Sequence, residues 1–378
     1  MTRAIVIGGG IGGLTTAIAL KQAGIDTVVF ERTAEFKEAG SGLHLAINAM
    51  RGLKELGLAE GVIERCGTPV ERMEFRDYRG KLLMLWPVSE LAARFGLPAV
   101  GVTRTSLQAL LAEGAGDALQ LGAEVTSFEQ DAEGVTVHLA DGREERADFL
   151  VGADGIWSKT RIALLGDGEP HYSGYLTSRA VIEFDQALMP PGLFRQFWGR
   201  GQVFIAYRVA DGRLYWVAAT KLDDNGALDR RALLERYRTF ADPVSAIIEA
   251  TPDEVILAVD AKDRQPVKRW GDGRVTLLGD AAHPMSPTQG QGACQAIEDA
   301  VVLGKSLAQG GDVVQALRAY EERRIPRSAK FVKQARTIGR LGCWEAPFAC
   351  GVRNQMMHLG GKAMYSRAAK EMSVEFDS

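Results

Sequence analysis

A short glycine-rich loop near the start of the sequence has the spacing needed to hold a phosphate. Gly8, Gly10 and Gly13 form a GxGxxG pattern, and Glu31 follows at the end of the next apolar run. The first glycine permits a tight turn, the second lets backbone amides approach a pyrophosphate, and the third lets a helix pack on a strand. The helix N-terminus attracts phosphate, and the acidic residue can accept hydrogen bonds from ribose hydroxyls. The pattern predicts a dinucleotide site, although nicotinamide enzymes, flavin enzymes and some non-catalytic proteins share it.

Two further glycine and aspartate segments lie far down the chain. Asp154 precedes a glycine directly after an apolar run, and this pair in isolation is typical of an ordinary turn. Asp280 follows a glycine, and the segment runs on through Gly290 to Gly292 and Ala293, where a helix is expected to begin. Asp280 could hold a sugar-like hydroxyl, and the amides of Gly292 and Ala293 offer positive potential to the edge of a ring that becomes anionic.

Alternating strands and helices flank these segments and are expected to position them. Apolar runs precede the glycines and helical periodicity follows them, as in βαβ nucleotide-binding units. The expected strands and helices are a strand at 5–7, a helix at 14–23, a strand at 27–31, a strand at 275–278 and helices at 293–307 and 313–322. One nucleotide-binding domain is therefore expected to be split along the chain.

The intervening residues have a different pattern. From about 172 to 267, aromatic-rich runs with strand-like alternation replace most helix signals. We therefore expect an α/β fold with a Rossmann-like nucleotide-binding domain, an inserted β-sheet substrate domain and C-terminal helices. The expected boundaries are 1–171 for the first part of the nucleotide-binding domain, with an interspersed substrate-layer segment at about 68–100, then 172–267 for the substrate domain, 268–330 for the second nucleotide-binding part and 331–378 for a C-terminal helical segment.

Composition and charge limit the classes of partner. The chain has 378 residues, 46% of them hydrophobic, which is enough for a large core. The 45 Lys and Arg residues nearly balance the 48 Asp and Glu residues, so no global field attracts nucleic acid or an acidic membrane. The four cysteines have no close CxxC spacing, which predicts reduced thiols and no metal site. Without a long apolar run, a cytoplasmic protein is expected. The sequence leaves open whether it is a monomer or a homodimer.

Together the three segments resemble those of the single-component flavoprotein monooxygenases of the para-hydroxybenzoate hydroxylase type. That family carries GxGxxG, DG and GD motifs in this order on a split FAD-binding domain of the GR2 type. The stretch Gly279-Asp280-Ala281-Ala282-His283-Pro284 is the most specific part of the resemblance, which covers nearly the whole chain. Within the family the sequence is similar to the branch of salicylate hydroxylase, 6-hydroxynicotinate 3-monooxygenase and FAD-dependent urate hydroxylase.

The resemblance implies FAD as the cofactor, NAD(P)H as the co-substrate and O2 as the oxidant. It implies that a flavin C4a-hydroperoxide transfers one oxygen atom to a small aromatic or heteroaromatic substrate. The residues that match the family's cofactor site are Gly8, Gly10, Gly13, Glu31 and Arg32 around the ADP half, Arg104 near the phosphates or ribityl chain, Asp154 by the NAD(P)H cleft, and Asp280, Gly290, Gly292 and Ala293 on the flavin side. Because the sequence has no second dinucleotide fingerprint, the nicotinamide is expected to visit the same cleft transiently.

The segment from 40 to 49 resembles a family motif, GAGIxLxPNA, that passes beside the flavin. Here Ile47 replaces the usual proline, so the local backbone is expected to differ. His44 stands at the variable position, where the hydroxynicotinate branch also has histidine. A histidine there could accept a proton or a hydrogen bond from a substrate hydroxyl, because its ordinary pKa lies near neutrality. It could equally be a polar residue on the rim of the site.

One tyrosine of the β-rich region is a second catalytic candidate. Tyr215 aligns with an active-site tyrosine of the hydroxynicotinate branch, and strand alternation requires Trp216 to point to the opposite face. Core packing is an equally good explanation for such an aromatic. Arg179 and Gln202 are weaker candidates for contacting a substrate carboxylate or carbonyl.

Alternatives to ring hydroxylation remain open at this stage. The same flavin chemistry serves epoxidation and Baeyer-Villiger oxidation, and no residue in the sequence separates these reactions firmly. A flavin-dependent halogenase is disfavoured because the WxWxIP pattern is missing. A non-catalytic binding protein that kept a dinucleotide fold is the remote alternative, and such a protein does not need an intact GD segment.

Overall fold

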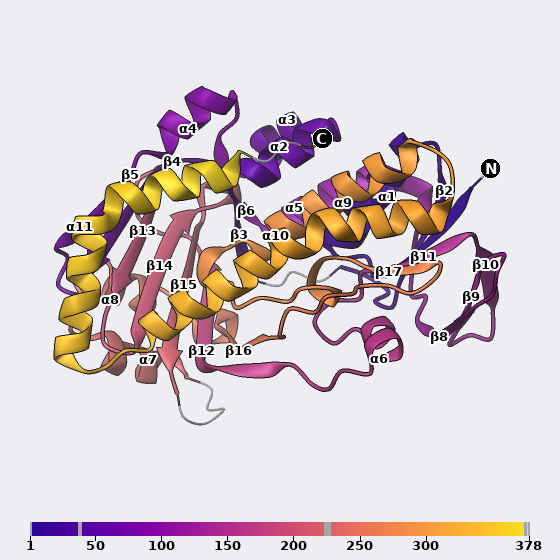
Figure 1. Cartoon of the computed structure of the whole chain (residues 1–378). Helices are drawn as coiled ribbons and strands as arrows, with labels where there is room; N and C mark the ends of the chain where they lie inside the picture. The colour runs from indigo at the N-terminus through magenta and orange to yellow at the C-terminus, as the bar shows by residue number, and fades with distance from the viewer. Residues whose placement is uncertain (1, 37–39, 223–227, 374–375, 377–378) are drawn as a thin grey trace.

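The computed structural model describes residues 2–36, 40–222, 228–373 and 376. Figure 1 shows a parallel sheet with its helices beside a larger sheet, a long helix, α10 (Val313–Gly342), that runs between them, and a last helix, α11 (Pro347–Met372), along the outer edge of the larger sheet. No helix in the described part of the chain is long and apolar enough to cross a membrane.

The parallel sheet places the three glycine segments side by side. Its strand order is β17-β11-β1-β2-β7, with β1 in the centre. The bounds are β1 Arg3–Ile7, β2 Asp26–Glu31, β7 Leu119–Leu121, β11 Phe149–Gly152 and β17 Val275–Leu277. The GxGxxG, DG and GD segments directly follow the carboxyl ends of the neighbouring strands β1, β11 and β17. Ligands of open α/β sheets bind at this edge, so the topology gathers all three segments around one crevice.

The second sheet has nine strands drawn from both halves of the sequence. Its order is β16-β12-β15-β14-β13-β4-β6-β3, and β5 pairs with β4 off this path. The bounds are β3 Gly42–Leu45, β4 Gly67–Asp77, β5 Leu82–Trp86, β6 Ala99–Thr103, β12 His171–Ile182, β13 Gly192–Trp198, β14 Gln202–Arg208, β15 Leu214–Lys221 and β16 Leu257–Asp263. Strands β3, β4, β5 and β6, which precede the DG segment, thus complete a sheet whose other members follow it.

Helices cover the two sheets, and a small antiparallel sheet lies at the far end of the molecule (Figure 1). The small sheet consists of β8 Val125–Gln130, β9 Val135–Leu139 and β10 Glu144–Ala147. The remaining helices are α1 Ile11–Gln22, α2 Ile47–Glu55, α3 Ala59–Arg65, α4 Val88–Phe95, α5 Arg104–Ala115, α6 Lys159–Leu165, α7 Arg230–Tyr237, α8 Val244–Glu249 and α9 Gly292–Ala308. Apolar residues of α1, α2, α5, α9 and α10 share one core with β1, β11 and β17.

Alternation along β15 sends neighbouring aromatic side chains to opposite faces of the large sheet. Trp216 is fully buried on one face, where it stacks on Phe204 with ring centroids 5.6 Å apart and donates to Thr251 Oγ1 at 2.9 Å. Tyr215 is buried on the other face with Phe194 and Tyr207. The expectation that these two residues point in opposite directions is confirmed.

Two helical features differ from the sequence-based expectation. The aromatic-rich region contains α7 and α8, which cover the Trp216 face, and Asp229 caps α7 by accepting from Ala232 N at 2.7 Å. Helix α10 does not stop near residue 322 but continues through Pro326 to Gly342. Proline ends many helices because it lacks an N–H. Here Ser328 and Phe331, two and five residues further on, are buried, so tertiary packing outweighs the missing hydrogen bond.

Candidate active site

The first glycine loop is shaped to admit a phosphate at one point and is closed elsewhere. Gly8 has a φ of +106°, and a Cβ there would clash with the carbonyl of Ala153. A Cβ on Gly13 would likewise run into the carbonyl oxygen of Gly8. A Cβ on Gly10, the residue before α1, would meet nothing within 4 Å. The open space thus lies where the backbone amides of the α1 N-terminus point, as a pyrophosphate requires.

Glu31 is held in place at the end of β2. Its Oε2 accepts from Gly9 N at 2.7 Å, and its Oε1 accepts from both the amide and the hydroxyl of Thr33 at 2.9 Å. Arg32, the next residue, is exposed. Gln108, on α5, donates to the carbonyl of Gly9 at 2.8 Å and so steadies the same loop. Nothing in the sequence singles out Gln108, because an amide on a helix belongs to no motif.

The DG segment is tied to the beginning of α6 and to the GD segment. Asp154 accepts from Ser158 Oγ at 2.5 Å and from Thr160 N at 3.1 Å, so its carboxylate organises the turn. Arg161 is fully buried and donates to the carbonyls of Ala281 and Ala282 at 3.0 and 2.6 Å. The two aspartate segments are therefore linked through Arg161, and the place of Asp154 by the NAD(P)H cleft stays a prediction.

Asp280 projects into a cleft of about 580 Å³ that Arg179 also lines. The carboxylate is accessible through the cleft but is surrounded by protein elsewhere, and this burial raises its pKa against the opposing effects of His283 and Arg104. An added Cβ on Gly292 would lie 3.7 Å from Asp280 Oδ1. Asp280, Arg104 and the start of α9 thus face one space, while the Arg104 side chain is exposed at the start of α5.

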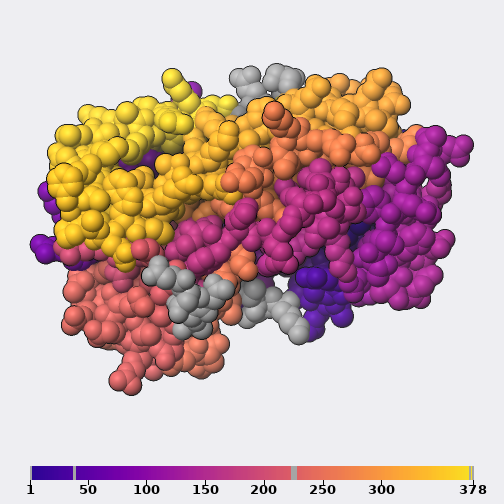
Figure 2. All heavy atoms as spheres, turned by 60° about the horizontal axis from the view of Figure 1, so that its bottom comes forward, coloured from indigo at the N-terminus to yellow at the C-terminus, as the bar shows by residue number. Residues whose placement is uncertain are grey.

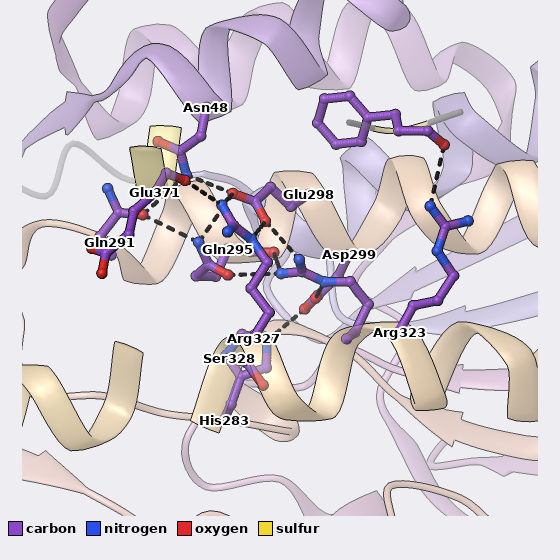
Figure 3. A network of polar contacts seen from close by, with 12 residues as sticks. Asn48, His283, Gln291, Gln295, Glu298, Asp299, Arg323, Arg327, Ser328 and Glu371 are labelled. Carbon is purple, nitrogen blue, oxygen red and sulfur yellow. Dashed lines mark hydrogen bonds and ion pairs between the residues drawn. The ribbon is translucent and has the colours of Figure 1, made fainter. Parts of the chain in front are cut away.

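A buried ionic network supports the GD segment from behind (Figure 3). Asp299 Oδ2 accepts from Gly279 N at 3.0 Å and contacts His283 Nε2 at 2.5 Å, while Arg324 Nε donates to Asp299 Oδ1 at 2.6 Å. Burial would raise the pKa of Asp299, but His283 and Arg324 outweigh it and lower the pKa to about 2. An ionised carboxylate therefore anchors the amide of Gly279 at the start of the GD turn.

The same network reaches the segment that carries His44. Glu298, beside Asp299 on α9, accepts from Arg324 Nη1 and Arg327 Nε at 2.6 Å each and from Asn48 Nδ2 at 2.6 Å. Asn48 also donates to Gln291 Oε1 at 3.0 Å, just before the first residue of α9. The network thus joins α10, the α9 loop and the start of α2. The only sequence signal for this network is a pair of adjacent acids, Glu298 and Asp299, within a largely apolar helical segment.

His44 packs against a buried aromatic cluster beside the α9 loop. Its ring centroid is 5.3 Å from that of Phe194 and 6.2 Å from that of Tyr207, both edge-on. A Cβ on Gly290 would lie 3.9 Å from His44 Cβ. His44 Nε2 is buried and has no hydrogen-bond partner, and burial lowers its pKa to about 4. At neutral pH the ring is therefore an uncharged imidazole with a free nitrogen.

Tyr215 belongs to the same aromatic cluster. Its ring lies edge-on to Tyr207 at 5.2 Å, and Tyr207 stacks on Phe194 at 4.8 Å. A Cβ on Gly42 would clash with the ring of Tyr215, so the glycine leaves the room that the tyrosine occupies. Burial raises the pKa of Tyr215, which keeps its hydroxyl protonated. The structure brings His44 and Tyr215 together and adds Phe194 and Tyr207, which sequence reasoning had not singled out.

The two weaker substrate candidates lie in different places. Arg179, on β12, has a buried Nε with no partner and lines the same cleft as Asp280. Gln202, at the start of β14, donates instead to the carbonyl of Arg236 at 2.8 Å. Gln202 lines neither this cleft nor the smaller cavity of about 220 Å³ near Ser41. Its side chain is engaged at the edge of the sheet and is not brought to the candidate site.

These features together fit an elongated dinucleotide that carries a redox-active ring. The open position at Gly10 and the carboxylate of Glu31 lie at one end, and Asp280 and the start of α9 lie further along the same sheet edge. The unpartnered nitrogens of His44 and Arg179 mark where a second molecule could bind. Orphaned buried polar atoms are uncommon in a folded protein and become satisfied when a ligand is present. The arrangement can therefore hold a cofactor and a small polar ring together.

Comparison with known proteins agrees with this geometry. Residues 1–335 match the FAD binding domain family. The chain is 38% identical over 363 residues to an aurachin C monooxygenase/isomerase of Stigmatella aurantiaca, which covers 94% of this chain and 93% of that protein. It is 39% identical over 341 residues to an FAD-dependent urate hydroxylase of Klebsiella pneumoniae, covering 88% of each.

A solved structure gives the same result in three dimensions. HpxO of Klebsiella pneumoniae, crystallised with FAD and uric acid, superimposes with a TM-score of 0.92 at 34% identity over 98% of this chain and 96% of that chain. The match extends over both sheets and the C-terminal helices, so the resemblance inferred from the three glycine segments is confirmed. The chain belongs to the FAD binding domain family and, within it, to the FAD-dependent monooxygenases.

Proposed function

We propose that this monooxygenase hydroxylates a small aromatic or heteroaromatic ring that bears an acidic hydroxyl or ring N–H, with NAD(P)H as the electron donor. One oxygen atom of O2 enters the ring and the other leaves as water, while NAD(P)H supplies two electrons. The observation that carries the proposal is the free Nε2 of His44, buried in an aromatic cluster against the α9 loop. Such an imidazole is neutral at pH 7, and the negative charge left on the substrate would stabilise the imidazolium against the effect of burial, so that Nε2 can accept the substrate proton.

The residues of the chain divide this task between them. The loop at Gly10, together with Glu31 and Asp280, would hold FAD, which supplies the oxygen-activating chemistry when it is bound. His44 would take up the substrate proton at Nε2, which increases the electron density of the ring. Arg179, through its free Nε, would stabilise the resulting anion, because a guanidinium remains charged when buried.

The aromatic side chains near His44 would orient the substrate ring and exclude water. Phe194 and Tyr207 are stacked at 4.8 Å with an interplanar angle of 11°, and Tyr215 lies edge-on to Tyr207 at 5.2 Å. A flat substrate can therefore pack against these rings, since aromatic pairs favour such stacked or edge-on contacts. Exclusion of water keeps the activated oxygen from being lost before it reaches the substrate.

The test is turnover by the purified, FAD-loaded enzyme with a panel of hydroxylated rings that includes uric acid. We expect at least one compound to stimulate NAD(P)H oxidation and to yield a product heavier by one oxygen atom. Product structure, determined by NMR, distinguishes ring hydroxylation from epoxidation and from Baeyer-Villiger insertion. The proposal fails if no panel member stimulates NAD(P)H oxidation. It also fails if the compounds that stimulate NAD(P)H oxidation give no product heavier by one oxygen atom.

A variant pair tests the role of His44 separately from folding. His44→Gln should retain FAD but lose most of its kcat/KM, because an amide cannot take up a proton; general base catalysis contributes roughly 10²–10⁴-fold. His138→Gln is the matched control, since His138 lies on the surface of the small sheet beside Glu129 and Glu144. Equal losses in both variants would contradict the assignment.

A further inference from the structure

Helix α11 buries one face and leaves the other face apolar and uncovered. Cys350, Arg353 and Met357 point inward, and Arg353 Nη2 donates to the carbonyl of Gly199 at 2.9 Å. The outward residues are Phe348, Val352, Met356 and Leu359, which are 83%, 40%, 55% and 74% exposed. Their spacing of four, four and three residues places them on one side of a helix. Figure 2 shows α11, in yellow, on the outer surface of the molecule.

The strand beneath the helix also carries exposed apolar side chains. His358 Nδ1 donates to the carbonyl of Leu83 at 3.3 Å, so α11 is fixed against β5. On that strand, Leu82 and Leu85 are 41% and 49% exposed. Apolar side chains scattered singly on a surface need no explanation, whereas a contiguous group of this kind marks a site of interaction.

The exposed charged side chains of the same helix are all cationic. Its outward cations are Lys362, Arg367 and Lys370, and all three are exposed. Its one acidic residue is Glu371, whose Oε1 is bound by Lys330 at 2.9 Å and Arg367 at 3.2 Å, so that acid is neutralised. An exposed apolar stripe followed by cations complements an anionic lipid surface, in which apolar chains lie beneath negatively charged headgroups.

We propose that α11 docks the enzyme on the surface of an anionic lipid bilayer, with Phe348, Val352, Met356 and Leu359 inserted among the lipids. The cations of the last turns would contact lipid phosphates. A second copy of the chain fits less well, because the stripe is one helix face and stable dimers use roughly 20–30 residues on each side. The near-neutral total charge of the chain argues against long-range attraction to membranes. The cations of α11 would instead attract anionic lipids locally.

Vesicle flotation with the full-length, FAD-loaded protein tests the proposal without requiring turnover. We expect the protein to float with vesicles of phosphatidylcholine mixed with phosphatidylglycerol but not with phosphatidylcholine alone. Added salt should weaken the association, since it screens exposed charges. Lys362→Glu with Lys370→Glu should lower the partition coefficient by roughly thirtyfold or more, because each interfacial cation contributes about fivefold.

Apolar variants and a matched control complete the design. Phe348→Ser with Leu359→Ser should lower the partition coefficient by at least about tenfold, because both side chains are removed from lipid. Ile162→Ser, at a residue 48% exposed on α6, should leave it unchanged. Absence of vesicle binding overturns the proposal. If light scattering then shows a dimer that Phe348→Ser dissociates, the surface belongs to a second copy of the chain. Equal losses in the Ile162 control would also overturn the assignment to α11.

Discussion

Replacement of Arg324 by methionine tests whether the buried network holds the flavin-side loop. The guanidinium is 2% exposed and donates to Asp299 Oδ1 and Glu298 Oε2 at 2.6 Å each and to Gln295 Oε1 at 2.8 Å. Removing one partner of a buried ion pair costs about 3–5 kcal/mol. Both acids keep a second partner, because His283 remains on Asp299 and Arg327 on Glu298. We therefore expect the lower end of that range, about 3 kcal/mol.

The assay is urea unfolding of the apoprotein, followed by tryptophan fluorescence, together with the dissociation constant for FAD. FAD affinity should fall about tenfold, which is about 1.4 kcal/mol, because Asp299 positions the amide of Gly279. Arg324→Lys should restore part of the stability, since lysine keeps the charge but not the planar fork. Arg323→Met, which removes a donor to the carbonyl of Phe376, is the control on the same helix.

The pH dependence of the stability loss follows from the carboxyl groups. The pKa of Asp299 is lowered to about 2, below its ordinary value of 3.8, so the stabilisation is present above about pH 4 and is lost as the pH falls toward 2. The difference between wild type and Arg324→Met should therefore be constant from pH 5 to pH 8 at about 3 kcal/mol. A loss below about 1 kcal/mol, with unchanged FAD affinity, would refute the structural role given to the network.

Three further substitutions test the aromatic cluster around His44 and the glycine loop. Gly10→Val should raise the FAD dissociation constant by about hundredfold or more, because its side chain fills the open space beside α1; flavin retained through gel filtration would contradict this. Gly42→Val should lower the unfolding free energy by about 2 kcal/mol through overpacking against Tyr215, and an unchanged urea midpoint would argue against a fixed tyrosine. Burial lowers the pKa of His44 from 6.5 to about 4. The unfolded chain therefore binds the extra proton between these values, and wild type should lose about 3 kcal/mol more than His44→Gln as the pH falls from 6.5 to 4; parallel curves of unfolding free energy against pH would exclude this.

The parts of the fold that could be predicted from sequence are those with a local signal. The three glycine segments each follow a short apolar strand, and this order was enough to place them at one sheet edge. Alternation along β15 also predicted that Tyr215 and Trp216 face opposite sides, since side-chain direction in a strand depends only on position.

The parts that could not be predicted depend on contacts between distant residues. Arg324 and Glu298 are 26 residues apart and lie on different helices, and only their packing shows that they form a pair. Phe194 and Tyr207 resemble any core aromatic until β13 and β14 pair and place them beside His44. The position of Gln202 could not be predicted for the same reason. Its hydrogen bond to the Arg236 carbonyl depends on how α7 packs on the sheet.

The way in which the nine-stranded sheet is assembled constrains how the chain folds during synthesis. Strand β4 pairs with β13 in parallel, and Val70 lies opposite Gly192. The parallel sheet likewise stays incomplete until β17 has been synthesised, because β17 pairs with β11 and begins at residue 275. Such long-range pairings delay folding, because the entropy of closing long loops must be lost before any contact forms. A ribosome that has released only the first half of this chain would therefore expose two unfinished sheets, and binding of chaperones to the nascent chain becomes an expected step in its biogenesis.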